Sequence, residues 1–472
     1  MSRNASLLVR MLREEWRRHA ELFGPVRFLL FPVGLAAASW LAIWFLLRGT
    51  TTAGDVGIGL HALVGLFGLH VGTVAFVGRD ALENLLGEVT LLVFSARTLP
   101  VSRSRLLATF LVKDLLYYAL WYVAPLVVAL SPFWLAEGRS PALLALLWAT
   151  TASCFLLGVS LSLFVAATYT RSRGAVLPVV AALALGTGWL GGDALALTPL
   201  GLYLDPSPLA ALLAYLPIVV LGLAGITLFR PEALSVHRTA DGRFREVRDR
   251  LPGDDEGLVA WTMFDVVRSS GSIWKLVFST GVVFAVCAFL VAQVDSMVGV
   301  RPATGLAFGT LLGLGSFTTY SWITQFDDPE TYLLYPLSVP DVIRAKFVAF
   351  TLLSLPISVG YLALAAWLFD TTALLAGVVV LVPMSVYVFG LTAHVTGLSP
   401  NQLLFDTPRF LRYGAGMALV AVPLLVAAIV HVQWPTEATL LSVGLSLLAG
   451  LVGIALYRRA GSTWDQRVRD GV

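Results

Sequence analysis

Residues 143–168 read LLALLWATTASCFLLGVSLSLFVAAT and contain no charged side chain. A helix needs roughly 20 consecutive apolar residues to cross the hydrocarbon layer of a bilayer. Because that layer holds no water, the spanning backbone must pair its own N–H and C=O groups, as a helix does. This stretch therefore predicts a transmembrane helix, and the rest of the chain repeats its pattern.

The composition of the whole chain fits a membrane environment. Of its 472 residues, 57% are hydrophobic and only 13% are charged, whereas a soluble domain carries about 25% charged residues. The two cysteines, Cys154 and Cys287, both lie in apolar runs, which is not the pattern of a disulfide framework or a metal cluster. A charged segment precedes the first apolar run, so we expect no signal peptide.

Apolar runs of spanning length fall into two sets of six. The first set covers residues 26–48, 57–78, 107–131, 143–168, 175–192 and 208–229. The second set covers residues 274–296, 304–324, 347–368, 372–396, 411–433 and 438–457. The sequence therefore predicts an all-α polytopic membrane protein with about twelve transmembrane helices.

The orientation follows from the basic residues, which concentrate in cytoplasmic loops. With the N-terminus inside, the outer loops hold Arg48, Arg139 and Arg301, and the other 29 of the 32 Lys and Arg residues lie on the inner side. A miscounted span would destroy this alternation. Both termini are therefore predicted to be cytoplasmic, in a multi-pass protein of the cell (plasma) membrane. The apolar outer loop Gly191 to Ser207 is expected to rest in the outer interface.

A polar segment separates the two sets of spans. We expect a first half at 1–230, a cytoplasmic linker at 231–256 and a second half at 257–472. Each half is predicted to begin with an amphipathic interfacial helix, Leu7 to Phe23 and Leu258 to Ile273, although a simple soluble lead-in is an alternative. The arginines of the linker could bind anionic lipid headgroups, but its acidic residues also fit a solvated connector.

Two sequence features recur in the halves. A Pro-x-Ser element precedes the third span of each, at Pro100–Ser102 and at Pro336–Ser338, where the serines are expected to be N-caps. The second span of each half carries small residues at four-residue spacing, which lets helices approach closely. These residues are Gly68, Gly72, Gly305, Gly309 and Gly313. The matching positions predict a parallel six-plus-six duplication.

The cytoplasmic stretch 88–103, EVTLLVFSARTLPVSR, resembles the segment before the third span of ABC-2 type permeases, the membrane subunits of many ATP-driven exporters. Residues 328–338, DPETYLLYPLS, are a shorter variant of it. The interfacial helix and the six-span unit add to the resemblance. Family members usually supply one six-span unit and dimerise, so this chain resembles a fused pair that needs no further permease subunit.

The resemblance implies that the loops between spans 2–3 and 8–9 dock on two copies of a cytoplasmic ATPase, whose closure on ATP rocks the membrane halves. Lipid would be the only other partner, with no nucleic acid. The ATPase-coupling residues that the resemblance implies are Glu83, Glu88, Arg97, Pro100, Ser102, Arg103, Arg105, Asp327, Asp328, Glu330, Pro336, Ser338, Asp341 and Arg344. Because the two segments differ in length, the two docking sites need not be equivalent.

No motif in the sequence predicts catalysis by the chain itself. A phosphate-binding loop requires glycine directly before its lysine, and the lysines, Lys113, Lys275 and Lys346, follow Val, Trp and Ala. No Ser/His/Asp grouping and no pair of carboxylates near the predicted midplane suggest an intramembrane enzyme. We therefore expect no enzyme, no metal and no cofactor in this chain, with ATP bound by the partner.

Four polar residues inside predicted spans are further candidates. Lys113 and Asp114 could line a transport path or join a gate; alternatively Lys113 snorkels to the inner interface and Asp114 pairs locally. His61 and His70 are nine residues apart in one span, so they do not share a helical face. Structural histidines are therefore the alternative to a metal site for this pair.

The main alternative function is a secondary transporter with six-plus-six topology. Such proteins usually carry intramembrane charge pairs, and the major facilitator family adds a Gly- and Arg-rich loop after its second span. The corresponding loop here, RDALEN at 79–84, lacks that pattern. A non-transporting membrane scaffold or enzyme is a third reading, without positive support in the sequence.

Overall fold

The computed structural model describes most of the chain, and within the described residues every element is a helix and none is a strand. The described residues are 3–23, 25–48, 52–77, 102–172, 174–176, 178–179, 182, 191–230, 243–251, 254, 257–269, 272–298, 301–325, 327, 332, 337–400, 403 and 406–469. The prediction of an all-α protein is confirmed for this part of the chain.

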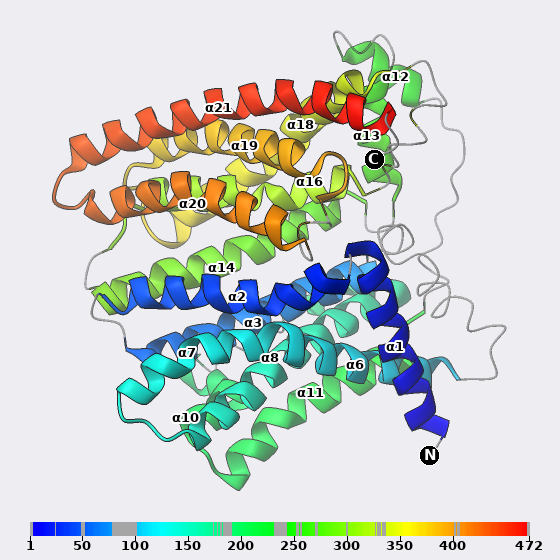
Figure 1. Cartoon of the computed structure of the whole chain (residues 1–472), viewed down its shortest axis with the longest axis vertical. Coiled ribbons are helices and arrows are strands. Elements are labelled where there is room, and N and C mark those ends of the chain that lie inside the picture. Colours follow the sequence, from blue (N-terminus) through cyan, green and yellow to red (C-terminus); the bar gives the residue numbers. More distant parts are fainter. Residues whose placement is uncertain are drawn as a thin grey trace. The chain divides into compact units, whose positions relative to one another are not determined.

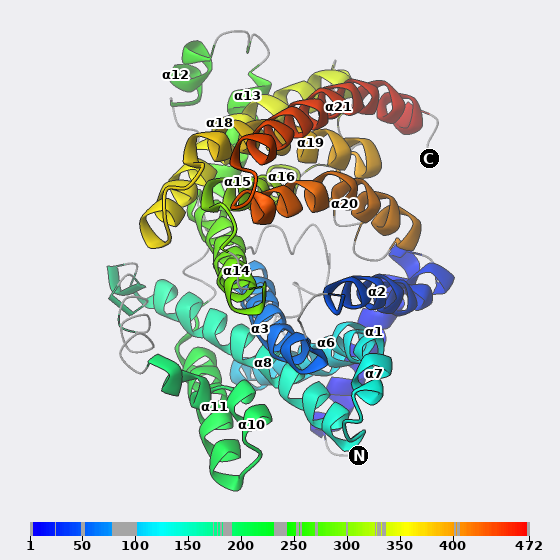
Figure 2. The same ribbon diagram turned by 90° about the vertical axis from the view of Figure 1, so that its left-hand side faces the viewer.

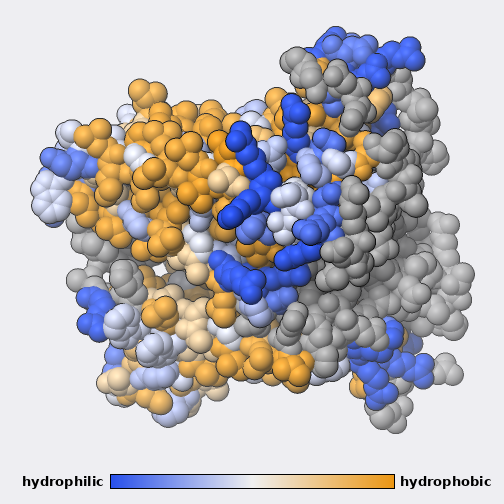
Figure 3. All heavy atoms as spheres, turned by 45° about the horizontal axis from the view of Figure 1, so that its top comes forward, coloured by the Kyte–Doolittle hydropathy of each residue, from blue (hydrophilic) through white to orange (hydrophobic). Residues whose placement is uncertain are grey.

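Nine helices of the described residues are long and apolar enough to cross a membrane. They are Ala53–Gly72, Ser104–Ala136, Ala142–Arg171, Pro208–Leu228, Trp274–Ala292, Val339–Leu368, Leu374–Thr396, Pro408–Val430 and Pro435–Arg467. Large apolar side chains are exposed along these helices, as the face in Figure 3 shows, and Trp367 and Leu375 are each 80% exposed. Contiguous apolar surface on this scale is typical of contact with lipid. The chain is therefore a multi-pass membrane protein.

The other three predicted spans have separate outcomes. In the region of residues 26–48, Pro25–Leu46 form one helix, and its uninterrupted stretch of described side chains, Phe28–Trp44, is apolar but shorter than a full span. Residues 304–324 form two short helices, because the helix is interrupted at Ser316, whose hydroxyl donates a hydrogen bond to the carbonyl of Gly313. Residues 175–192 lie mainly outside the described residues. The count of twelve and the cytoplasmic termini stay predictions.

The chain divides into two compact units, Met1–Ser235 and Val236–Val472, at a point inside the predicted linker. The helices of the first unit are α1 (Arg3–Phe23), α2 (Pro25–Leu46), α3 (Ala53–Val77), α6 (Arg103–Tyr118), η2 (Ala119–Val123), α7 (Ala124–Ala136), α8 (Ala142–Arg171), η3 (Gly191–Leu197), α10 (Pro199–Leu204) and α11 (Pro208–Leu228).

The helices of the second unit are α12 (Arg243–Arg250), α13 (Leu258–Arg268), α14 (Trp274–Val298), α15 (Thr304–Gly315), α16 (Phe317–Ile323), α18 (Val339–Leu368), α19 (Leu374–Thr396), α20 (Thr407–Val430) and α21 (Pro435–Arg469).

Three long helices of the chain begin at a polar cap followed by proline. Oxygens of Ser207, Ser338 and Asp406 accept bonds from the amide three residues on, at 3.1, 3.3 and 3.2 Å. These bonds satisfy amides that the first helical turn leaves unpaired.

In the first unit, α3 and α11 pack on α8, and the three helices run side by side (Figures 1 and 2). The contact with α3 is close because it is made by glycine. A Cβ added to Gly68 would lie 2.2 Å from the carbonyl oxygen of Phe155, and one added to Gly158 would lie 2.2 Å from that of Gly65. Helices in lipid associate through such small residues, because apolar side chains gain little by leaving lipid for a helix interface.

The second unit repeats this packing with the corresponding spans. Its second span, α15, and its last span, α21, both pack on its fourth span, α19. Gly309 faces Gly377 across the first contact, and Gly390 faces Gly453 across the second. In both units, therefore, the glycine-rich second span lies against the fourth span, as the repeated small residues predicted for a close helix contact.

The helices of the second unit alternate in direction. At one end, the start of α15 meets the start of α19 and the end of α20. There the backbone N–H groups of Gly305 and Ala303 donate hydrogen bonds to the carbonyls of Thr372 and Ala428. At the other end, Trp464 of α21 donates to the carbonyl of Ala393 at the end of α19. This second end, where α18 begins, is the predicted cytoplasmic end.

We expect Gly309→Ala to destabilise the second unit. The added Cβ would lie 2.4 Å from the carbonyl oxygen of Gly377, and overpacking of this kind lowers the free energy of unfolding by about 1–3 kcal/mol. Thermal unfolding of the purified protein in detergent measures the effect. Gly444→Ala on α21 is the matched control, because its Cβ would meet nothing within 4 Å. Equal unfolding temperatures for the two variants would contradict the packing role.

Candidate functional site

All three lysines of the chain are buried, whereas the arginines supply the exposed positive charge. Lys113, Lys275 and Lys346 are 2%, 1% and 3% exposed. An ammonium group withdrawn from water is strongly destabilised unless it is paired and hydrogen-bonded. The surroundings of these lysines therefore show where each unit holds polar groups inside its apolar framework.

In the first unit, Lys113 is the centre of a buried cluster of three charges. Its Nζ lies 2.5 Å from a carboxylate oxygen of Glu15 and 2.8 Å from one of Asp114. Glu15 belongs to α1 and the other two residues to α6, so the cluster fixes the N-terminal helix to the start of the third span. This geometry favours local pairing of Lys113 and Asp114 over snorkelling of Lys113.

The helix α1 is the predicted interfacial helix, and it runs across the helices of its unit instead of along them (Figure 1). Met11 and Glu15, four residues apart, face inward and are buried. Trp16 adds aromatic contacts, with ring centroids 5.3 Å from Phe28 and 5.4 Å from Trp121. The sequence interpretation missed Glu15, because a carboxylate among arginines looks solvated; its position one turn after Met11 was the available signal.

The third span of the first unit is interrupted just beyond this cluster. Between α6 and α7, Ala119–Val123 form a π-helical turn, and the indole nitrogen of Trp148 donates to the carbonyl of Ala119 at 2.9 Å. Such turns are frequent at functional sites, because they change the direction of the side chains that follow. Hydropathy does not reveal the turn, since all five residues are apolar.

In the second unit, Lys346 has the corresponding place on α18. Its Nζ lies 2.8 Å from a carboxylate oxygen of Asp327 and donates to the carbonyl of Ile323 at 2.7 Å. The hydroxyl of Tyr332 donates to the same carboxylate at 2.6 Å. The pair joins the end of the second span of this unit to the start of its third span.

Lys275, at the start of α14, lies near the same end of the unit. It donates to the hydroxyl of Ser269 at 2.5 Å, and its Nζ lies 4.7 Å from the ring centroid of Trp322. Ser269 directly follows α13, so this lysine ties that helix to the first span. The indole of Trp322 is held in turn by a bond to Ser279.

The helix α13 packs on the start of α18, as α1 packs on α6. Leu258 and Val259 form a small buried cluster with Ala345 and Ala349. The Asp254 carboxylate accepts hydrogen bonds from the backbone amides of Val259 and of the next residue, both at 2.9 Å, and so fixes the start of the helix. In both units, therefore, the helix that precedes the first span lies beside a buried lysine at the start of the third span.

The predicted ATPase-coupling residues are only partly described. The structure places Ser338 as the cap of α18, with its hydroxyl bonded to the Asp341 carboxylate, and Arg344 exposed on that helix. Ser102 occupies the cap position of α6 without a side-chain bond, Arg103 begins that helix, and Arg105 is half-buried. The residues outside the described part of the chain are Glu83, Glu88, Arg97, Pro100, Asp328, Glu330 and Pro336.

Asp327 does not fit its predicted role of facing an ATPase. Its side chain is almost fully buried and pairs with Lys346. A carboxylate in this position acts on a partner protein only through the span to which it is bound. The tertiary structure explains the difference, since the sequence shows an acidic residue in a loop but not the lysine that approaches it from the next helix.

The two histidines of α3 differ in their surroundings. One ring nitrogen of His61 lies 2.7 Å from the carbonyl oxygen of Gly57, and the other lies 2.8 Å from the hydroxyl of Thr150. Both nitrogens of His61 therefore have partners, one within α3 and one on α8, which favours the structural interpretation. His70 is not among the partners of His61. Among the described residues, no three His, Cys, Asp or Glu side chains gather as metal ligands.

No protein-family model, no curated protein and no solved structure matches this chain. The similarity to ABC-2 type permeases thus rests on the residues quoted above.

We expect Lys113→Met to lower the free energy of unfolding by about 3–5 kcal/mol, because it leaves two buried carboxylates without their cation. The triple variant Lys113→Met, Glu15→Gln, Asp114→Asn should recover most of this loss. Arg17→Gln is the control, since Arg17 and Glu14 form an ion pair at the surface that contributes about 1 kcal/mol or less. Thermal unfolding in detergent compares the three. Similar losses for K113M and R17Q would refute the central role of the cluster.

Proposed function

We propose that the chain is the permease subunit of an ATP-driven ABC transporter of the ABC-2 type, an exporter in the plasma membrane. In this proposal separate ATPase subunits, in two copies, dock on the segments between spans 2–3 and 8–9. The observation that carries the proposal is the buried lysine at the start of each third span. It joins that span to the neighbouring interfacial helix or loop at the predicted cytoplasmic end.

The chemistry of these contacts suits the transmission of a force. Removing one partner of a buried ion pair destabilises the folded protein by about 3–5 kcal/mol. Because separating the partners is so unfavourable, the elements that they join move together. Lys113 connects α1 to α6, and Asp327 and Lys346 connect the end of α16 to α18. A displacement of the segment before α6 or α18 therefore reaches the membrane helix directly instead of being lost in a flexible loop.

The energy source in this proposal is outside the chain. None of the three lysines follows a glycine, so a phosphate-binding loop of the usual kind is absent from the sequence. We accordingly propose that the partner binds and hydrolyses ATP, and that the chain itself is no enzyme.

The two couplings are unequal in form: two carboxylates surround Lys113, whereas Lys346 pairs with one carboxylate and one backbone carbonyl.

A secondary transporter remains the second candidate, because Lys113 and Asp114 form a charge pair inside a candidate span. The position of the pair argues against it. The span Ser104–Ala136 has 33 residues, more than the roughly 20 that hydrocarbon requires, and the pair lies in its first third, toward the predicted cytoplasmic end. Transport that continues without ATP and stops when the proton gradient is abolished would favour this candidate.

The direct test is co-purification of the chain with a candidate ABC ATPase, sought first among the neighbouring genes, followed by assay of ATP hydrolysis in liposomes. We expect a stable complex and hydrolysis that rises when the permease is present. The absence of both would refute the proposal.

We expect the double charge reversal Arg103→Glu, Arg105→Glu to weaken ATPase binding by at least about tenfold, because reversed charges at a docking surface repel the partner. Pull-down from detergent extracts measures the binding, and protease accessibility of the loops checks insertion. Arg48→Glu is the control, an exposed arginine in a predicted outer loop. Unchanged binding in the double variant would count against docking at this segment.

A further inference from the structure

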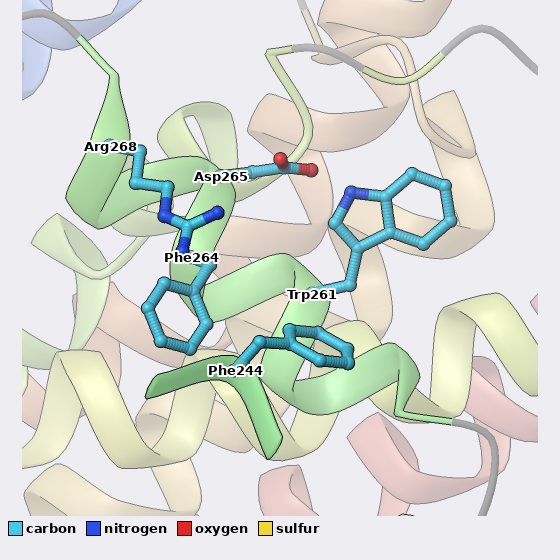
Figure 4. Close-up of a pocket in the computed structure, with 5 residues that line it drawn as sticks. All are labelled: Phe244, Trp261, Phe264, Asp265 and Arg268. Atoms are coloured by element: carbon cyan, nitrogen blue, oxygen red, sulfur yellow. The ribbon is translucent and has the colours of Figure 1, made fainter. Parts of the chain in front are cut away.

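The second unit contains a pocket that the proposed coupling does not use. It has a volume of about 130 Å³ and is lined by Phe244 of α12 and by Trp261, Phe264, Asp265 and Arg268 of α13 (Figure 4). The volume fits a small organic group such as ethanolamine or choline, but not a drug-sized ligand. Because all five residues belong to the second unit, the pocket is complete within it.

One part of the pocket suits a cation. Three aromatic side chains contribute to its wall, and the ring centroids of Phe244 and Phe264 are 6.0 Å apart. Aromatic faces attract ammonium groups, and cages of such rings are a usual way to recognise quaternary ammonium ligands. The Asp265 carboxylate adds a negative charge, and it points away from Arg268, toward the side of Trp261 (Figure 4).

Another part suits an anion. The guanidinium of Arg268 lies over the ring of Phe264, 4.5 Å from its centroid. Its Nη2 is buried, and none of the described residues accepts a hydrogen bond from it. An unsatisfied buried donor is destabilising, and guanidinium groups form strong charge-assisted hydrogen bonds with phosphate and carboxylate oxygens.

The pocket lies at the level where lipid headgroups are expected. Trp261 and Asp265 also line a small cavity with Val342 and Lys346 of α18, so the pocket is level with the first two turns of that span. Trp274, which begins the neighbouring span α14, and Ile273 directly before it have exposed apolar side chains. Tryptophan is enriched at this depth, and acyl chains could continue from the pocket along the surface of α14.

We infer that this pocket binds the zwitterionic headgroup of a membrane phospholipid, such as phosphatidylethanolamine or phosphatidylcholine. The ammonium lies among the aromatic rings beside Asp265, and the phosphate accepts hydrogen bonds from Arg268. The lipid thereby fastens α13 and α12 to the bilayer. This inference does not rest on the proposed ABC function, since it concerns the second unit in any membrane.

The test is lipid binding to the purified full-length protein, measured by native mass spectrometry with added phosphatidylethanolamine or phosphatidylglycerol. We expect tighter binding of phosphatidylethanolamine, and a loss on the order of tenfold for that lipid alone in Asp265→Asn, which removes a charge-assisted contact. Asp249→Asn is the matched control, because Asp249 is exposed, pairs with Arg248 and does not line the pocket.

Three outcomes would overturn the inference. One is equal binding of the two lipids by the unaltered protein. Another is equal binding of phosphatidylethanolamine by D265N and D249N. The third is full competition by free glycerophosphoethanolamine at the concentration of the lipid, which would make the site one for a soluble ligand. Should D265N fail to fold, Phe244→Leu, which removes one ring and keeps apolar volume, is tested against D249N in the same way.

Discussion

A buried ammonium group must meet a negative charge or accept a large free-energy penalty, and this constraint organises the end of each unit where the third span begins. The three lysines of the chain are all withdrawn from solvent. Two of them, Lys113 and Lys346, hold carboxylates that other segments supply. A long surface side chain would leave those segments free to move independently. The buried pairs instead join the interfacial helix or loop to a span.

The body of each unit obeys a different constraint. Helices in lipid gain little from exchanging apolar lipid for apolar protein, so close contact between backbones must hold them together. Glycines supply that contact at the same place in both units, between the second and fourth spans. This packing is the same in both units, whereas the charged ends differ: a triad in one unit and a pair with a carbonyl in the other.

These two levels divide the work that the proposed function requires. The glycine contacts keep the apolar part of each unit rigid, and the lysine contacts link it to the predicted cytoplasmic segments. The pocket beside α13 adds a third kind of contact, to the headgroups of the bilayer itself. A helix that is bound to a span on one side and to lipid on the other stays at a constant depth, which defines the surface that a partner meets.

Hydropathy alone determined that the chain is a helical membrane protein, because the apolar content of a segment reports its solvent. The spacing of Gly305, Gly309 and Gly313 gave the close helix face, and Ser338 gave a cap, since both depend on near neighbours. The pairing of Glu15 with Lys113 did not follow, because the two lie 98 positions apart. The same holds for the burial of Asp327 and for the break at Ser316. Whether a charge is solvated or paired depends on which segments meet in space, and only the tertiary structure decides that.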